Sequence, residues 1–98
     1  MDEALIMTAV DLSGRSWLGY DLQIPAEKVG TFNTELGEEF FLAFVRNARC
    51  TLHIRQMAGT NSHHILEGAF KSLAWALREA TAIDPSLEGE VLSTKGLL

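Results

Sequence analysis

The sequence predicts an α+β domain in which a small β-sheet carries two helices on one face. Two segments, at 17–24 and 50–57, alternate apolar and polar residues with the period of two that is typical of strands. Two others, following residues 33 and 61, repeat apolar residues at helical spacing. Because these elements are interspersed within 98 residues, we expect a single domain over 1–98 with one core.

The first two strands are predicted to form a β-hairpin. Residues 5–10 are mostly apolar and lead into the turn signal Asp11-Leu12-Ser13-Gly14. The second strand then alternates two sets of side chains, which are Leu18, Tyr20, Leu22 and Ile24 on one face and Trp17, Gly19, Asp21 and Gln23 on the other. Pro25 and Gly30 end this pattern. The apolar run at 5–10 puts apolar side chains on both faces of its strand, so we expect one face of the sheet to need a cover.

A first helix is expected after Asn33 or Thr34, either of which can cap its N-terminus. Leu36, Phe40 and Phe44 follow helical spacing and are predicted to face the core. The first turns hold acidic side chains, which the helix dipole favours there: Glu35, Glu38 and Glu39.

A third strand is predicted at 50–57, with Leu52 and Ile54 on one face and Thr51, His53 and Arg55 on the other. The second helix begins near Ser62 and is predicted to bury one apolar stripe, which consists of Leu66, Ala69, Phe70, Leu73 and Leu77. A different stripe runs at i+4 steps and is predicted to face away from the core: His63, Glu67, Lys71 and Trp75.

Composition excludes several classes of function. The net charge is −5 and the eight Lys and Arg residues form no run, so we expect no nucleic-acid partner and no anionic membrane partner. No apolar stretch is long enough to span a bilayer, and no leader segment opens the chain. The single cysteine, Cys50, cannot form an internal disulfide and is read as a small buried hydrophobe. These features predict a cytoplasmic protein.

Two histidines and a glutamate at the start of the second helix are candidate metal ligands. His63 and Glu67 are i and i+4, and His64 and Glu67 are i and i+3, so Glu67 neighbours both rings. The two rings point roughly 100° apart around the helix axis, which favours two ions over one. The positive end of the helix dipole favours neutral imidazole, the form that binds metals. The alternative is that both rings are solvated or cap the helix.

Motifs along nearly the whole chain resemble imidazoleglycerol-phosphate dehydratase, an enzyme family of histidine biosynthesis. They occur in the family's order: Met1-Asp2-Glu3-Ala4-Leu5, Asp11-Leu12-Ser13-Gly14-Arg15, Thr51-Leu52-His53-Ile54-Arg55, Gly59-x-Asn61-x-His63-His64-x-x-Glu67, Phe70-Lys71 and Ser93-Thr94-Lys95-Gly96. The resemblance covers only the C-terminal half of the family's tandem-duplicated sequence. It implies that the chain is one half-domain of the dehydratase fold, without the first half and its own His-His-x-x-Glu motif.

The resemblance also implies a reaction and a site. The reaction is the dehydration of imidazole glycerol phosphate to imidazole acetol phosphate. Two manganese ions per complete site would be held by His63, His64, Glu67 and Glu39, the last of which stands where the family often has a histidine. The substrate phosphate would be held by Arg15, Ser93, Thr94 and Lys95, and the implied catalytic groups are Glu67, Lys71 and Asp2. His53 and Arg55 belong to a family motif but are interpreted as structural or supporting groups.

Two functions remain open from the sequence. One is a metal-dependent hydro-lyase whose site is completed by another chain, which the retention of Arg15 and Lys71 favours. The other is an isolated or engineered half-domain that folds, binds metal and self-associates without turnover, which the single His-His-x-x-Glu motif favours. Both predict a symmetric homo-oligomer, because a half-domain leaves a surface that a second copy would cover.

Overall fold

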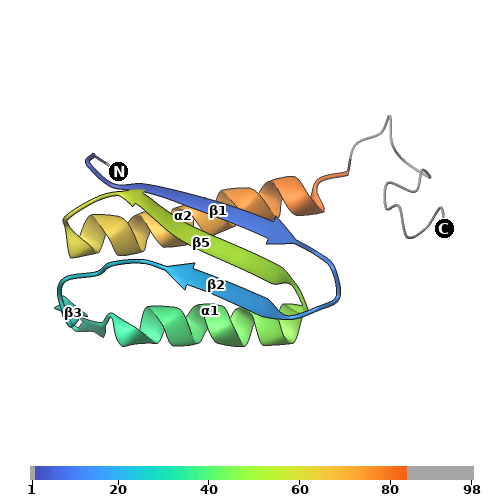
Figure 1. Cartoon of the computed structure of the whole chain (residues 1–98), viewed down its shortest axis with the longest axis horizontal. Helices are drawn as coiled ribbons and strands as arrows, with labels where there is room; N and C mark the ends of the chain where they lie inside the picture. The colour runs from blue at the N-terminus through green and yellow to red at the C-terminus, as the bar shows by residue number, and fades with distance from the viewer. Residues whose placement is uncertain (1, 84–98) are drawn as a thin grey trace.

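The computed structural model describes residues 2–83, and it has the α+β architecture that the sequence predicts. Along the chain the elements are β1 (Leu5–Asp11), β2 (Trp17–Asp21), β3 (Lys28–Val29), β4 (Phe32–Asn33), α1 (Glu35–Ala48), β5 (Thr51–Ala58) and α2 (Ser62–Thr81). The three longer strands lie side by side in front of the two helices (Figure 1). Ser93, Thr94 and Lys95 fall outside the described residues.

The main sheet has the strand order β1-β5-β2, so the predicted hairpin between β1 and β2 is wrong. β5 lies between them, antiparallel to β1 and parallel to β2. Alternation shows that each strand has one buried face, but it does not show which strands are neighbours. As the central strand, β5 carries the two most deeply buried strand positions among the described residues, Leu52 and Ile54, which are 0% and 1% exposed.

The loop between β1 and β2 crosses the end of β5 instead of turning back on β1. Two neighbouring strands lie about 4.8 Å apart, so the loop has to span about 10 Å, a distance that five residues cover. The Thr51 side chain anchors it, because its hydroxyl pairs with the Ser13 hydroxyl at 3.2 Å and donates to the carbonyl of Arg15 at 3.2 Å. The backbone N–H of Trp17 also donates to the carbonyl of Cys50 at 3.2 Å.

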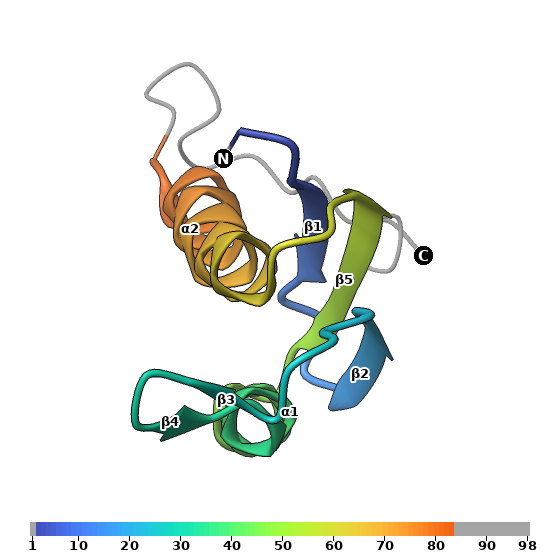
Figure 2. The same ribbon diagram turned by 90° about the vertical axis from the view of Figure 1, so that its left-hand side faces the viewer.

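Both helices cover the same face of the sheet, as predicted (Figure 2). α2 packs on β1 and β5, whereas α1 packs beside β2. The core draws on both helices and the central strand, and its buried members are Phe41, Val45, Cys50, Leu52, Ile54, Ala69 and Leu73. Full burial of one such aliphatic or aromatic side chain stabilises the fold by about 1.5–3 kcal/mol.

The buried face of α1 differs in part from the predicted one. Leu36 and Phe40 are 47% and 50% exposed, whereas Phe44 is partly buried against the core as predicted. The buried residues of this helix are Gly37, Phe41 and Val45. Two stripes run along this helix at i+4 steps, one through Phe40 and one through Phe41. The second is hard to recognise in the sequence because a glycine stands at position 37. Gly37 faces the core because a Cβ there would lie only 3.1 Å from Leu66 Cδ1.

A two-residue ladder, β3 with β4, precedes α1 and was not expected from the sequence. Thr34 holds it in place, since its hydroxyl donates to the carbonyls of Ala26 and Glu27 at 2.8 and 3.0 Å. Thr34 occupies the N-cap position of α1, but the side-chain oxygen of Asn33 accepts the hydrogen bond from the first helical N–H, at 3.0 Å. Both predicted capping residues therefore take part.

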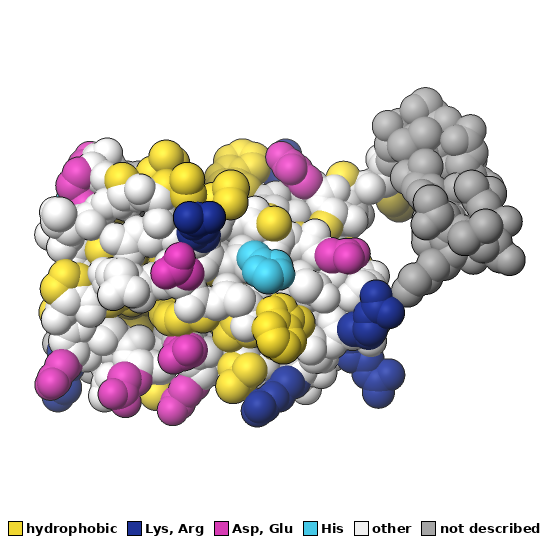
Figure 3. Space-filling view, in the orientation of Figure 1, with side chains coloured by type: hydrophobic (Ala, Val, Ile, Leu, Met, Phe, Trp, Pro, Cys, Tyr) yellow, Lys and Arg dark blue, Asp and Glu magenta, His cyan; other side chains and the backbone are white. Residues whose placement is uncertain are grey.

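The face of the sheet turned away from the helices is open and partly apolar (Figure 3). Four large hydrophobic side chains are more than half exposed on its strands: Leu5, Met7, Trp17 and Met57. This confirms the expectation that β1 carries apolar side chains on both faces. Within the described residues, neither helix is apolar and long enough to cross a membrane.

Candidate metal and catalytic site

The turn between β5 and α2 places two histidines in the first helical turn. Gly59 has a φ of 141°, and a Cβ there would lie 3.0 Å from Ile65 Cγ1, so a larger residue would strain the turn. Asn61 follows as the N-cap, and its side-chain oxygen accepts a hydrogen bond from the backbone N–H of His64 at 3.0 Å. The centroids of the His63 and His64 rings are 6.2 Å apart, with an interplanar angle of 74°. The two rings therefore face different surroundings, as predicted.

His63, Glu67 and Lys71 form a line of ion pairs along α2. The Glu67 carboxylate lies between its partners, with Oε2 2.9 Å from His63 Nε2 and Oε1 2.8 Å from Lys71 Nζ. The hydrogen bond from Lys71 lowers the pKa of Glu67 below its ordinary value of 4.5. The side chains of His63 and Lys71 are 61% and 62% exposed, so these pairs orient Glu67 more than they stabilise the fold.

His64 lies on the other side of the helix, against the acidic N-terminal segment. Its Nδ1 is 2.5 Å from Glu3 Oε1, and its Nε2 is 3.5 Å from Asp2 Oδ2. The second oxygen of Glu3 accepts hydrogen bonds from the backbone N–H groups of Thr60 and Asn61 at 2.7 and 3.3 Å. The hydrogen bond with His64, helped by these backbone bonds, lowers the pKa of Glu3 to about 2. Glu3 is thus a firmly held anion at the start of α2.

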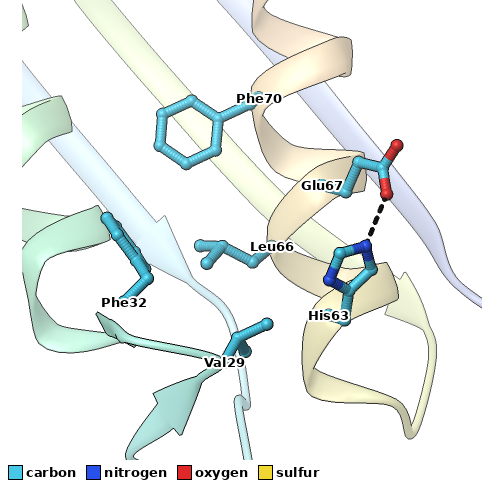
Figure 4. A pocket seen from close by; sticks show the side chains of 6 residues that line it. All are labelled: Val29, Phe32, His63, Leu66, Glu67 and Phe70. Atoms are coloured by element: carbon cyan, nitrogen blue, oxygen red, sulfur yellow. Dashed lines mark ion pairs between the residues drawn. The ribbon is translucent and has the colours of Figure 1, made fainter.

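An apolar groove of about 310 Å³ opens beside the His63–Glu67 pair (Figure 4). The β3–β4 ladder supplies one wall and α2 the other, and the lining residues are Val29, Phe32, His63, Leu66, Glu67 and Phe70. Phe32 and Phe70 face each other across the space, whereas the ion pair stands at its rim. The groove would bring an apolar surface next to a carboxylate and an imidazole.

The structure brings together only some of the predicted site residues. Glu67 and Lys71 are in contact with each other, but Asp2 lies with His64. Glu39 is exposed one turn into α1, and its side chain makes no hydrogen bond or ion pair with another described residue. Within residues 2–83, no three His, Cys, Asp or Glu side chains converge on one point as a metal site.

Arg15 lies at the opposite end of the sheet from the histidines. Its carbonyl bonds to Thr51 at the start of β5, whereas α2 begins just after the end of β5 at Ala58 (Figure 1). The intervening seven residues of β1 span roughly 20 Å at the usual rise of a strand. The backbones of Arg15 and His63 are therefore far apart within one chain.

The third histidine, His53, stands on the open face of the sheet and away from the helix start. Its ring covers Gly19, where a Cβ would lie 2.5 Å from His53 Nδ1, so a larger residue there would displace the His53 ring. Beside it, Arg55 Nε is 3.9 Å from Asp21 Oδ2, and both side chains are exposed. The supporting role of His53 and Arg55 stays a prediction.

Sequence reasoning did not single out Glu3 as a site residue. It contacts His64 across 61 positions of sequence, and no local spacing can reveal such a pair. One signal could have found it. Glu3 is an acidic residue just before β1, and β1 pairs with β5, which leads directly into the helix that carries the two histidines.

Known proteins of one family resemble this chain over its whole length. The family model for imidazoleglycerol-phosphate dehydratase matches residues 1–77. All 98 residues align at 57% identity with 47% of the imidazoleglycerol-phosphate dehydratase of Prochlorococcus marinus (strain MIT 9313). They align at 55% identity with 36% of the chloroplastic enzyme 1 of Arabidopsis thaliana. The chain thus spans between a third and a half of the length of these curated relatives.

Solved structures of the same family share the fold. The Staphylococcus aureus enzyme superposes with a TM-score of 0.83 at 49% identity, over 86% of this chain and 49% of that one. The Pyrococcus furiosus enzyme, crystallised with (S)-C348, gives 0.84 at 42% identity, over 100% and 53%. The family match, these identities and the shared fold show that this chain belongs to the imidazoleglycerol-phosphate dehydratase family of histidine-biosynthesis dehydratases.

Proposed function

We propose that this chain supplies one half of a metal-dependent active site that dehydrates imidazole glycerol phosphate to imidazole acetol phosphate. The observation that carries the proposal is the paired arrangement at the start of α2, where His63 with Glu67 and His64 with Asp2 lie in separate surroundings. Each place offers an imidazole nitrogen and a carboxylate oxygen. Membership of the dehydratase family supports the type of reaction.

The donors present fit manganese in kind. His63, His64 and Glu67 would hold two ions, and Glu39 would add a carboxylate from α1. Mixed nitrogen and oxygen donors suit such an ion, and any further donors would come from outside this set of residues. A bound ion would act as a Lewis acid toward the imidazole ring of the substrate.

The protein's own proton-transfer groups are Glu67, Lys71 and Asp2. Glu67 is an ionised carboxylate and can accept a proton, while Lys71, 2.8 Å away, can donate one to a departing hydroxyl. Asp2 lies on the side of His64, with its Oδ2 3.5 Å from His64 Nε2, and its carboxylate can accept a proton there.

The substrate phosphate would be held by Arg15 with Ser93, Thr94 and Lys95, since a guanidinium fork, hydroxyls and an ammonium group complement a phosphate dianion. Arg15 lies the length of the sheet away from His63 within one chain. We therefore propose that each complete site combines the metal ligands of one half-domain with the phosphate-binding residues of another chain. A homo-oligomer in the cytoplasm would fulfil this requirement.

The alternative function is a half-domain that folds, binds metal and self-associates without turnover. The observation that favours it is the incomplete metal site, because within residues 2–83 no three His, Cys, Asp or Glu side chains converge on one point. A turnover assay with imidazole glycerol phosphate separates the two. Activity that requires added manganese supports the dehydratase, whereas metal binding without turnover supports the alternative.

The metal assignment is tested by counting manganese ions bound per chain. The double change His63→Ala with His64→Ala should abolish most of the bound metal, because it removes both nitrogen donors. His53→Ala is the matched control, as it removes the third histidine on the open face of the sheet and should leave the count unchanged. Unaltered stoichiometry in the double variant would show that the assignment is wrong.

A further inference from the structure

Glu3 connects the N-terminal segment both to the backbone and to a side chain of α2. We propose that it is a positioning residue that fixes the tautomer of His64, with the proton on Nδ1 and the lone pair of Nε2 free for a divalent cation. The role of the Nε2 lone pair in binding a cation rests on the proposed metal-binding function. The choice of tautomer is a property of the chain alone.

The two oxygens of Glu3 have separate partners. Oε2 accepts from the backbone N–H groups of Thr60 and Asn61, and Oε1 contacts His64 Nδ1. An ionised carboxylate can only accept hydrogen bonds, so Nδ1 must be the donor. In a neutral ring the other nitrogen then carries the lone pair. The hydrogen bond of Glu3 thereby selects which nitrogen can bind a metal.

The surroundings hold this pair in place. The His64 side chain is only 25% exposed, and both oxygens of the Glu3 carboxylate, whose side chain is 39% exposed, are engaged in hydrogen bonds. The backbone N–H of His64 is bound by the Asn61 cap. Nε2 faces Asp2 at 3.5 Å, too long for a strong hydrogen bond. A carboxylate that binds the far nitrogen of a metal-ligating histidine orients the ring and raises its basicity.

The change Glu3→Gln separates the two tasks of this side chain. A glutamine has one acceptor oxygen, and the N–H groups of Thr60 and Asn61 require it. The amide NH₂ would then face His64 Nδ1, where it can only donate. Nδ1 would become the acceptor, and the proton would move to Nε2. The helix start would keep its acceptor, but the nitrogen that faces outward would be blocked.

The test uses the whole chain labelled with ¹⁵N at histidine, without metal and at a pH where the rings are neutral. Only three rings contribute signals, and His63→Asn and His53→Asn assign them. Long-range ¹H–¹⁵N spectra should show the proton of His64 on Nδ1 in the wild type and on Nε2 in Glu3→Gln. The matched control Glu79→Gln, at the far end of α2, should behave as the wild type.

Manganese titration of the same proteins tests whether the tautomer of His64 controls metal binding. Affinity should fall about 10- to 100-fold in Glu3→Gln, the usual loss when a partner of a ligating histidine is changed, and should be unchanged in Glu79→Gln. A wild-type His64 protonated on Nε2 overturns the proposal without any variant. An unchanged tautomer or unchanged affinity in a folded Glu3→Gln also overturns it. If the wild type binds no manganese but the tautomer switches, the proposed function fails while the positioning role of Glu3 stands.

Discussion

Phe40 and Phe41 are adjacent on α1 but have opposite surroundings. Phe41 is fully buried, and its ring centroid lies 4.9 Å from that of Phe70 and 6.0 Å from that of Tyr20. Phe40 is 50% exposed. Replacing each ring by alanine therefore measures which side of α1 is turned toward the sheet, with residue type and helix position almost unchanged.

Phe41→Ala should lower the free energy of unfolding by about 3–5 kcal/mol, because it removes a buried ring and leaves a cavity. That is a large part of the 5–15 kcal/mol that is usual for a domain. Phe40→Ala should cost about 1 kcal/mol in the isolated chain, since full burial of a phenylalanine is worth about 1.5–3 kcal/mol and only half of this ring is covered.

Urea unfolding followed by far-ultraviolet circular dichroism measures both losses, at several protein concentrations. At the lowest concentration, an equal or larger loss in Phe40→Ala would refute the orientation of α1. At higher concentration the loss in Phe40→Ala should grow if a second copy covers Phe40. The loss in Phe41→Ala should keep its size in the concentration range where the chain is monomeric.

Three further predictions concern phosphate, the buried thiol and assembly. Arg15→Ala and Lys95→Ala should each weaken binding of a phosphate-bearing inhibitor by about 10-fold or more, because a charge-assisted hydrogen bond contributes about 1.5–3 kcal/mol. Equal affinity in Arg15→Ala and in the control Arg78→Ala would show that Arg15 does not bind the phosphate. Burial raises the pKa of Cys50 above its ordinary value of 9.0, so the unfolded chain loses this proton first and stability should fall as pH rises from 9.0 to the folded pKa. Cys50→Ala should flatten that pH dependence, and native Cys50 should resist iodoacetamide; rapid alkylation of the folded chain would contradict its burial. Light scattering should show an oligomer that manganese strengthens and chelator weakens, and a monomeric mass under both conditions at micromolar protein would disprove assembly.

Local pattern predicted the elements well, but not all of their neighbours. β5 and α2 lie where alternation and helical spacing placed them, and Leu52, Ile54, Leu66, Ala69 and Leu73 are buried as expected. The predicted pairing of β1 with β2 was wrong because β5 pairs with both of them across long stretches of sequence. No residue spacing within 5–24 indicates that a strand from 51–58 will lie between β1 and β2.

The prediction of which face of α1 is buried was partly wrong for a related reason. Apolar residues occupy more than half of its circumference, so periodicity alone could not separate the stripe through Phe40 from the stripe through Phe41. The choice is made by packing, because Gly37 admits Leu66 and lets Phe41 reach Tyr20 and Phe70. Leu36 and Phe40 of the other stripe remain exposed.

The candidate site was predictable where one helix carries it. His63, Glu67 and Lys71 form their line because i+4 spacing makes them neighbours. The surroundings of His64 depend on Glu3 and Asp2, which are adjacent in space only because β1 pairs with β5. Side chains that meet through a sheet leave no short-range pattern.

The positions of Arg15 and His63 also constrain how copies of the chain can assemble. The two residues lie at opposite ends of β1, roughly 20 Å apart at the rise of a seven-residue strand. A two-fold axis perpendicular to the strands exchanges these ends, so it would place Arg15 of each copy on the side of the other copy's histidines. One such contact completes two equivalent sites at once, because an isologous interface repeats every pairing. A parallel, head-to-tail stacking would instead leave an unpaired end at each terminus of the stack. The arrangement of the predicted ligands therefore favours a closed symmetric oligomer, with each site shared between two chains.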